Sequence, residues 1–202
     1  MKTICVFCGS SLGIRPSYRQ AAADLGKVIL DNDLSLIYGG ANVGLMKVLA
    51  DTVLAGGGEV TGIMPRRLVE NEVAHKSLTK MYIVESMSER KTMMVELSDA
   101  FIAMPGGFGT FDELAEMITY NQLRLTDKPI GILNTDDYFD FLLKFFTHSA
   151  EEGFLRHEHK NNLIIDKNPR ELIKKLAHYQ PVSIDKWIFD IKEESKNAGG
   201  IL

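Results

Sequence analysis

Glu113 stands one helical turn beyond a glycine-rich stretch that runs from Pro105 to Thr110. The apolar run 100–104 precedes this stretch and a helical pattern follows it, so we expect a strand, a turn and then a helix. Glycines let the backbone approach a ligand closely, and the first N–H groups of a helix point outward without partners, which suits an anion. A phosphate site beside a carboxylate indicates chemistry on a phosphorylated sugar or nucleotide.

The same carboxylate also has a purely structural interpretation. Thr110 and Glu113 match the capping box S/T-x-x-E, with the threonine at the N-cap of a helix and the glutamate three residues later. The glycines favour the ligand interpretation, because a cap does not require Gly106, Gly107 and Gly109 together.

Arg90 and Lys91 form a second group that could take part in chemistry. They lie near the start of an expected helix, where cations oppose the positive end of the helix dipole and reduce stability. A cost of this kind can mark an anionic partner. The alternative is an ordinary solvated pair of charges on a helix surface.

The elements that must position these groups alternate in type along the chain. Runs rich in β-branched and aromatic residues predict strands at 3–7, 35–38, 60–64, 80–84, 100–104, 129–133 and 163–166. Amphipathic segments predict helices at 17–31, 44–56, 87–98, 110–124, 137–151 and 169–178. This alternation predicts an α/β fold, a Rossmann-like doubly wound parallel sheet with helices on both faces. We expect a single domain over 1–180 and a partly docked C-terminal tail over 181–202.

Several of the expected strands end in glycine. The residues in these turns are, in chain order, Gly9, Ser10, Gly39, Gly40, Gly106 and Gly107. In open α/β sheets, ligands bind beyond the carboxyl ends of the strands, near the point where the strand order reverses. We therefore expect the turns to line one crevice, with the irregular segment 68–80 as a candidate loop beside it.

The glycines do not match the common nucleotide motifs. The dinucleotide fingerprint G-x-G-x-x-G fails because Asp112 occupies its third glycine position, and the sequence has neither a P-loop nor a G-x-S-x-G elbow. Cys5 and Cys8 form C-x-x-C, but Cys5 lies within an expected strand and no second cysteine pair exists. We therefore expect a buried thiol rather than a redox or zinc site.

Composition narrows the class of protein. The 202 residues are 45% hydrophobic, enough for one full core, and the net charge of -4 without a Lys/Arg cluster argues against a nucleic-acid partner. The apolar run 4–7 is too short for a signal peptide, and nothing approaches the length of a spanning helix. We expect a cytoplasmic protein with no membrane partner.

A longer set of motifs surrounds the glycine-rich stretch. The nonapeptide P-G-G-x-G-T-x-x-E is complete from Pro105 to Glu113, and with it stand C-G-S-S at 8–11, Y-G-G at 38–40, G-L-M at 44–46, G-I-M-P at 62–65, E-V-A-H at 72–75, R-K at 90–91 and K-P-I-G at 128–131. On this ordered set the chain resembles, from Thr3 to about Leu176, the lonely guy family of cytokinin-activating phosphoribohydrolases, often mislabelled lysine decarboxylases. Ser88 departs from the family pattern, which often has His there.

The resemblance implies an activity, a partner and a set of site residues. The activity is hydrolysis of the N-glycosidic bond of a nucleoside 5'-monophosphate, AMP or an N6-modified cytokinin form, to free base and ribose 5-phosphate. The protein would be a homodimer with sites near the dimer interface and would need no organic cofactor or metal. Arg90 and Glu113 would be catalytic. The residues implied to contact substrate are Glu72, Lys91, Gly106, Gly107, Phe108, Gly109, Thr110 and Thr119.

The individual roles and two rival functions stay open at this point. Glu113 could stabilise an oxocarbenium-like state directly, hold a ribose hydroxyl or orient water, and Arg90 could bind phosphate or assist departure of the base. A non-catalytic carrier of a nucleotide or of molybdenum cofactor could use the same fold. Lysine decarboxylation is disfavoured, because it needs an electron sink such as pyridoxal phosphate and no lysine lies in a recognisable cofactor motif.

Overall fold

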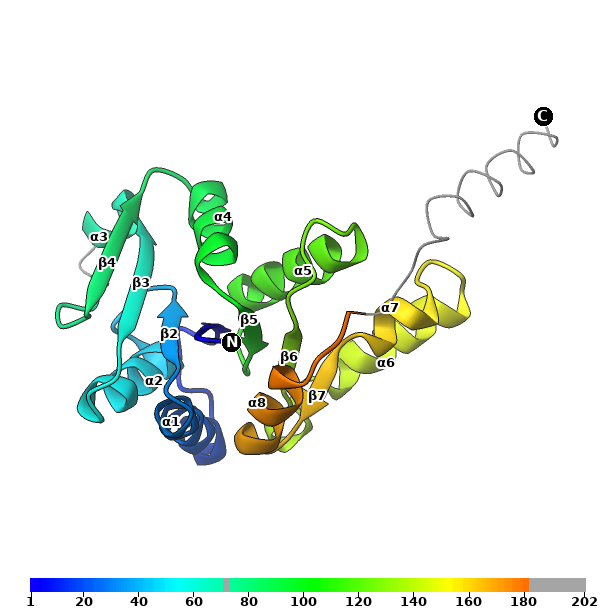
Figure 1. Cartoon of the computed structure of the whole chain (residues 1–202), viewed down its shortest axis with the longest axis horizontal. Coiled ribbons are helices and arrows are strands. Elements are labelled where there is room, and N and C mark those ends of the chain that lie inside the picture. Colours follow the sequence, from blue (N-terminus) through cyan, green and yellow to red (C-terminus); the bar gives the residue numbers. More distant parts are fainter. Residues whose placement is uncertain (71–72, 182–202) are drawn as a thin grey trace.

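Seven parallel strands form one sheet in the order β4-β3-β2-β1-β5-β6-β7 (Figure 1). The computed structural model describes residues 1–70 and 73–181; Glu72 and residues 182–202 of the tail expected over 181–202 lie outside them. The strands are β1 (Thr3–Phe7), β2 (Ser35–Tyr38), β3 (Val60–Pro65), β4 (Lys80–Val84), β5 (Ala100–Ala103), β6 (Ile130–Leu133) and β7 (Ile164–Asp166). The α-helices are α1 (Pro16–Asp31), α2 (Gly44–Ala55), α3 (Arg66–Glu70), α4 (Met87–Leu97), α5 (Phe108–Gln122), α6 (Asp140–Glu151), α7 (His157–Asn161) and α8 (Pro169–Ala177).

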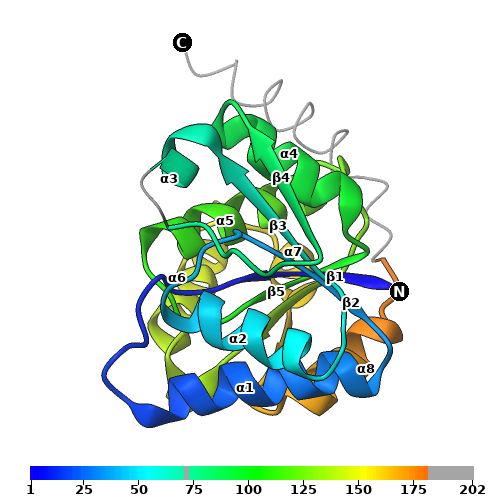
Figure 2. The ribbon, with the colours of Figure 1, turned by 90° about the vertical axis from the view of Figure 1, so that its left-hand side faces the viewer.

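The sheet is doubly wound around β1. From β1 the chain adds β2, β3 and β4 on one side and then returns to place β5, β6 and β7 on the other, so the strand order reverses between β1 and β5. Helices α1, α2 and α8 cover one face, and α4 and α5 cover the other (Figure 1 and Figure 2). The predicted fold class is confirmed.

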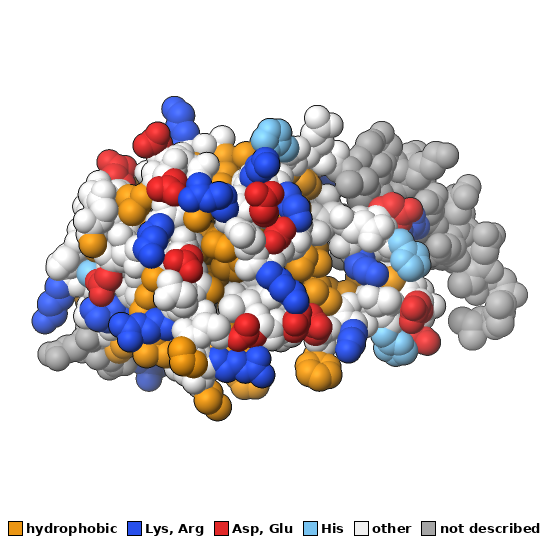
Figure 3. Space-filling model, turned by 90° about the horizontal axis from the view of Figure 1, so that it is seen from below, with side chains coloured by type: hydrophobic (Ala, Val, Ile, Leu, Met, Phe, Trp, Pro, Cys, Tyr) orange, Lys and Arg blue, Asp and Glu red, His pale blue; other side chains and the backbone are white. Residues whose placement is uncertain are grey.

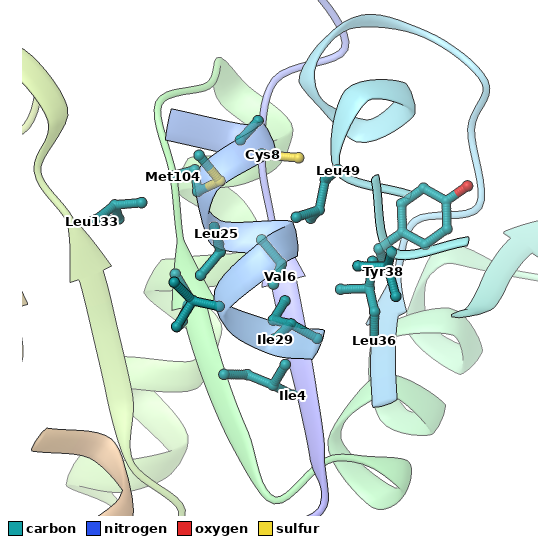
Figure 4. Packing of buried hydrophobic residues seen from close by; sticks show 14 of the residues in the cluster. Ile4, Val6, Cys8, Leu25, Ile29, Leu36, Tyr38, Leu49, Met104 and Leu133 are labelled. Carbon is teal, nitrogen blue, oxygen red and sulfur yellow. The ribbon is translucent and has the colours of Figure 1, made fainter. Parts of the chain in front are cut away.

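The core is built on both faces of β1. Ile4 and Val6 pack against Leu25 and Ile29 of α1, with Leu49 of α2 beside them (Figure 4). Alternate residues of the strand point to the opposite face, where they enter a second apolar cluster. A strand buried on both faces reads as a continuous apolar run, which is why β1 could be recognised from its sequence.

The second apolar cluster contains Cys5, the first cysteine of the C-x-x-C motif. Cys5 is fully buried in the cluster that contains Phe7 and Phe101, and both Cys5 and Cys8 are free thiols. Burial raises the pKa of Cys5, because the charged thiolate would lose its solvation. The prediction of a buried thiol at Cys5 is confirmed.

One expected helix begins later than its apolar pattern indicates. The segment expected as a helix over 137–151 is helical from Asp140, and a short 3-10 turn, η1 (Thr135–Asp137), precedes it. Asp136 and Asp137 have φ angles of 51° and 61°, in the left-handed region that ends α-helical continuity. The short helices α3 and α7 were not predicted, because five residues are too few to show a helical period.

The surface over α1, α2 and α8 carries Lys or Arg and Asp or Glu side chains side by side rather than a field of one sign (Figure 3). Within residues 1–70 and 73–181, no helix is both long and apolar enough to cross a membrane.

Candidate active site

The crevice lies at the reversal in strand order, where the turns after β1 and β5 meet. The N–H of Gly9 donates to the carbonyl of Pro105 at 3.0 Å, so the two turns are joined directly. A Cβ added at Gly106 would lie 2.9 Å from the Gly9 nitrogen and 2.1 Å from Thr110 Oγ1, so this contact requires glycine. A pocket of about 280 Å³ opens there, lined by residues that include Gly9, Ser10, Gly106, Gly107, Tyr18 and Tyr138.

Helix α5 starts earlier than the capping-box interpretation requires. The helix begins at Phe108, Gly107 is its N-cap, and no side chain makes a capping hydrogen bond. Thr110 and Glu113 therefore both lie inside the helix, and the capping-box interpretation of this pair is wrong. The same pattern does form a cap at α4, where the Ser86 hydroxyl accepts from the N–H of Glu89 at 3.1 Å.

Glu113 takes no part in a helix cap and instead forms an ion pair with Arg90. Arg90 Nη2 lies 3.3 Å from Glu113 Oε1, and the two side chains are only 11% and 10% exposed. Arg90 Nε also donates to the carbonyl of Ile63 at 3.0 Å, which holds the guanidinium over β3. A Cβ at Gly39 would lie 2.2 Å from Arg90 Nη2, so the glycine after β2 makes room for the arginine.

Burial changes the proton affinity of the glutamate. Loss of solvation raises the pKa of Glu113 to about 7, although the attraction of Arg90 opposes this rise. Asp112 raises the pKa further by like-charge repulsion, and Lys91 lowers it. Near neutral pH the carboxyl therefore changes protonation state, a property typical of groups that act in acid–base or charge-stabilising chemistry.

Lys91 lies beside the pair but points its ammonium at two other carboxylates. Its Nζ is 3.1 Å from Asp112 Oδ2 and makes a second, shorter contact with Glu116. The Tyr120 hydroxyl donates to the other oxygen of Glu116 at 2.9 Å. The hydrogen bond to Glu116 raises the pKa of Lys91, so the side chain is a fixed positive charge that ties α4 to α5.

The segment after α3 folds back against the Gly39-Gly40 turn. His75 donates its backbone N–H to the Gly40 carbonyl at 2.9 Å. Its ring Nδ1 accepts from the N–H of Ser77 at 3.2 Å, which leaves the proton on Nε2, 3.0 Å from Asp51 Oδ1. The buried histidine thereby holds the segment that follows Glu72 against the turn after β2.

Thr119 lies apart from the crevice. It is exposed on α5, its hydroxyl donates to the Ala115 carbonyl at 2.8 Å, and it lines a groove with Phe111 and Phe154. Of the expected site residues that the structure describes, Gly9, Ser10, Gly106 and Gly107 line one crevice and Gly39 lies against Arg90, whereas Thr119 is exposed in a separate groove.

Tyr138 is a site residue that the sequence did not reveal. Its hydroxyl donates to the carbonyl of Gly106, and its ring meets Tyr18 edge-on with centroids 5.7 Å apart. The sequence predicted a helix over 137–151, so Tyr138 was not recognised as part of a turn after β6. Because β6 ends at the same edge of the parallel sheet as β1 and β5, the turn after β6 could have been expected near the crevice.

Fold and site together place the chain among doubly wound α/β proteins whose glycine-lined crevice lies at the reversal in strand order. The family model described as "possible lysine decarboxylase" matches residues 46–176. The cytokinin riboside 5'-monophosphate phosphoribohydrolase LOG5 of Arabidopsis thaliana is 42% identical over 182 residues, which cover 90% of this chain and 80% of that protein. The probable cytokinin riboside 5'-monophosphate phosphoribohydrolase LOGL1 of rice (Oryza sativa subsp. japonica) is 45% identical, with 87% and 79% covered. The chain belongs to this family, and the resemblance to the lonely guy proteins is confirmed.

Solved structures support the fold. The molybdenum cofactor binding protein of Rippkaea orientalis superposes with a TM-score of 0.67 at 24% identity, covering 88% of this chain and 97% of that one. The molybdenum cofactor carrier protein of Chlamydomonas reinhardtii gives 0.66 at 18% identity, covering 88% and 99%. At these identities the likeness concerns the arrangement of the sheet and helices.

Proposed function

We propose that this protein hydrolyses the N-glycosidic bond of a nucleoside 5'-monophosphate, AMP or an N6-modified cytokinin riboside form, to free base and ribose 5-phosphate. The observation that carries the proposal is the buried Arg90–Glu113 pair, 3.3 Å apart, with Glu113 on the helix α5 that begins directly after the glycines of the crevice. The relatives' activity supports it, because the chain covers most of their length at more than 40% identity.

The phosphate has a natural binding place at the start of α5. Gly107 and Gly109 have no neighbour within 4 Å of an added Cβ, so the backbone between them is open to a ligand. The first N–H groups of α5 lack helical partners there, and the positive end of the helix dipole favours an anion. Phe108 and Thr110 complete this loop.

Glu113 acts on the sugar in this proposal. As the bond between C1' and the base nitrogen breaks, positive charge develops at C1', and an ionised carboxylate stabilises it in a site of low solvation. Water adds to C1', loses a proton, and a proton is delivered to the departing base. Arg90 keeps the carboxylate oriented through its simultaneous bonds to Glu113 and the Ile63 carbonyl.

The remaining substrate contacts come from the neighbouring turns. Ser10 lines the crevice, and Gly39 and Gly40 form the turn after β2 whose Gly40 carbonyl accepts from the N–H of His75. Glu72 is proposed to contact the substrate as well. Lys91 contributes positive charge to the site while its ammonium stays between Asp112 and Glu116.

The proposed functional unit is a homodimer in the cytoplasm. Phe108, Phe141 and Phe154 are 95%, 83% and 88% exposed, and large apolar side chains that are exposed to this degree favour an interface. Thr119 lines the groove on this side of the molecule, so its implied contact with substrate would reach the site of a second copy. Sedimentation of the pure protein tests this: a monomer at micromolar concentration would contradict the proposal.

The two rival functions fit this chain less well. A Schiff-base lysine must lose its proton, whereas Glu116 raises the pKa of Lys91, the lysine of this site. A cofactor carrier shares the fold, but a carrier of an anion gains nothing from a buried carboxylate beside its ligand.

The direct test is incubation with AMP and with N6-isopentenyl AMP, followed by chromatography of the free base. Release of base together with ribose 5-phosphate supports the proposal, and the ratio of the two rates gives the base preference. Adenosine should react poorly, because it lacks the phosphate that aligns the sugar. A folded protein that releases no base from either nucleotide, or that retains a cofactor through purification, would favour the carrier.

A further inference from the structure

The turn after β6 reaches across the sheet edge to the glycine-rich loop. Tyr138 follows directly after the 3-10 turn η1 and donates its hydroxyl to the carbonyl of Gly106. Its ring packs edge-on against Tyr18, at a centroid distance of 5.7 Å, and against Phe139, at 5.1 Å. The side chain, which is 42% exposed, thus contacts both α1 and the loop that precedes α5.

This turn is anchored on several sides. The hydroxyl of Ser17 donates to the carboxylate of Asp136, and Lys167 pairs with Asp137. Asn134 accepts from the N–H of Phe139 at 2.8 Å through its side-chain oxygen. Two consecutive aspartates with positive φ are uncommon, and such a conformation persists only where the surroundings hold it.

The hydrogen bond from Tyr138 has a consequence for the neighbouring N–H. In a trans peptide the carbonyl of one residue and the N–H of the next point in opposite directions. When the Gly106 carbonyl is held toward Tyr138, the N–H of Gly107 is held away from it. Because both residues are glycines, the peptide between them would otherwise rotate more freely than any other in the loop.

We infer that Tyr138 is a positioning residue for phosphate recognition: it holds the Gly106–Gly107 peptide so that the Gly107 N–H is presented to the 5'-phosphate. This inference rests on the proposed function in assigning the phosphate to the loop. It adds a residue from a different segment, the turn between β6 and α6. This residue sets the affinity for the phosphorylated end of the substrate and leaves the chemistry at C1' to Arg90 and Glu113.

The test compares Tyr138→Phe with Tyr179→Phe. Tyr179 donates its hydroxyl to Asn162 at 2.9 Å, far along the chain from the crevice, so its variant loses a hydroxyl bond without touching the loop. Binding of ribose 5-phosphate is measured by calorimetry, and kcat and KM are measured with AMP. For Tyr138→Phe we expect roughly tenfold weaker binding, a matching rise in KM and a nearly unchanged kcat. For Tyr179→Phe we expect wild-type values.

The readouts separate this inference from the proposed function. If the protein binds ribose 5-phosphate in a way that depends on Tyr138 but does not turn over AMP, the positioning role is supported and the proposed enzymatic function is contradicted. Turnover with the same KM and the same binding in both variants overturns the positioning role alone, as does a fall in kcat without a change in KM. If Tyr138→Phe does not fold, Ser17→Ala loosens the turn from outside the crevice, and a wild-type affinity in that folded variant counts against the inference.

Discussion

The Arg90–Glu113 ion pair joins the two halves of the sheet across its centre. Arg90 is held over the β2–β3 side by the Ile63 carbonyl and the space at Gly39, whereas Glu113 lies on α5, which follows β5 on the other side of β1. The pair therefore closes over the reversal in strand order, with both side chains about one-tenth exposed.

Glu113→Gln should abolish most of the activity while the fold remains. The amide keeps the shape of the side chain but cannot carry the negative charge that stabilises the developing cation, so the rate with AMP should fall roughly 10²–10⁴-fold. Glu96→Gln on the exposed side of α4 is the matched control and should react like the wild type. Nearly full activity in Glu113→Gln would remove the carboxylate from the mechanism.

The stability of the protein should depend on Glu113 with a defined sign. Its folded-state pKa of about 7 exceeds the ordinary value of 4.5, so the folded state binds more protons than the unfolded state in this interval. Stability should therefore fall as pH rises from 5 to 8, by about 2.5 kcal/mol from this group. Chemical denaturation of wild type and Glu113→Gln at both pH values isolates the effect, because the variant lacks it. Parallel pH dependences in the two proteins would contradict the raised pKa.

Arg90→Lys should impair turnover although it keeps the positive charge. The guanidinium contacts Glu113 and the Ile63 carbonyl through different nitrogens at once, and a single ammonium cannot reproduce that fork. We expect kcat to fall by about tenfold or more with little change in the melting temperature. Restored activity on adding guanidine to Arg90→Ala would support the same role, and a fully active Arg90→Lys would contradict it.

Changes at Lys91 and Glu116 should move the pH profile of catalysis in opposite directions. Lys91 lowers the pKa of Glu113 and Glu116 raises it, and Arg90 and Asp112 also act on the pKa of this carboxyl, Arg90 lowering it and Asp112 raising it. Lys91→Met should shift the acid limb of kcat/KM to higher pH, and Glu116→Gln should shift it to lower pH. Profiles that move in the same direction, or not at all, would show that these charges do not act on Glu113.

Gly39→Ala should disable the site by displacing the arginine. An added methyl would lie 2.2 Å from Arg90 Nη2, so the guanidinium must leave its place beside Glu113. At Gly109 an added methyl meets no atom within 4 Å, which makes Gly109→Ala the steric control. We expect kcat to collapse in the first variant and to persist in the second, where only KM should change. Equal kcat values would show that the space at Gly39 is not needed.

The order of strands and helices could be predicted because it depends on neighbours in the chain. The apolar runs of β1 and β5 and the helical period of α1 are local patterns, and the ordered motifs around Pro105 identified the family. The start of α5 was expected near Thr110, because Thr110 and Glu113 match the S/T-x-x-E capping pattern. Ser86 and Glu89 match the same pattern, and only the backbone shows that a capping hydrogen bond forms at α4 and not at α5.

The amino-acid sequence by itself determined the alternation of strands and helices, the glycine turns at one edge of the sheet and the presence of Arg90 and Glu113. The tertiary structure decided which groups meet: Arg90 with Gly39 and Glu113, Lys91 with Glu116, and Tyr138 with Gly106. These partners come from different elements, so their distances are set by how helices pack on the sheet. Local propensity and periodicity carry no information about that packing, since they describe only residues within one or two turns of the chain.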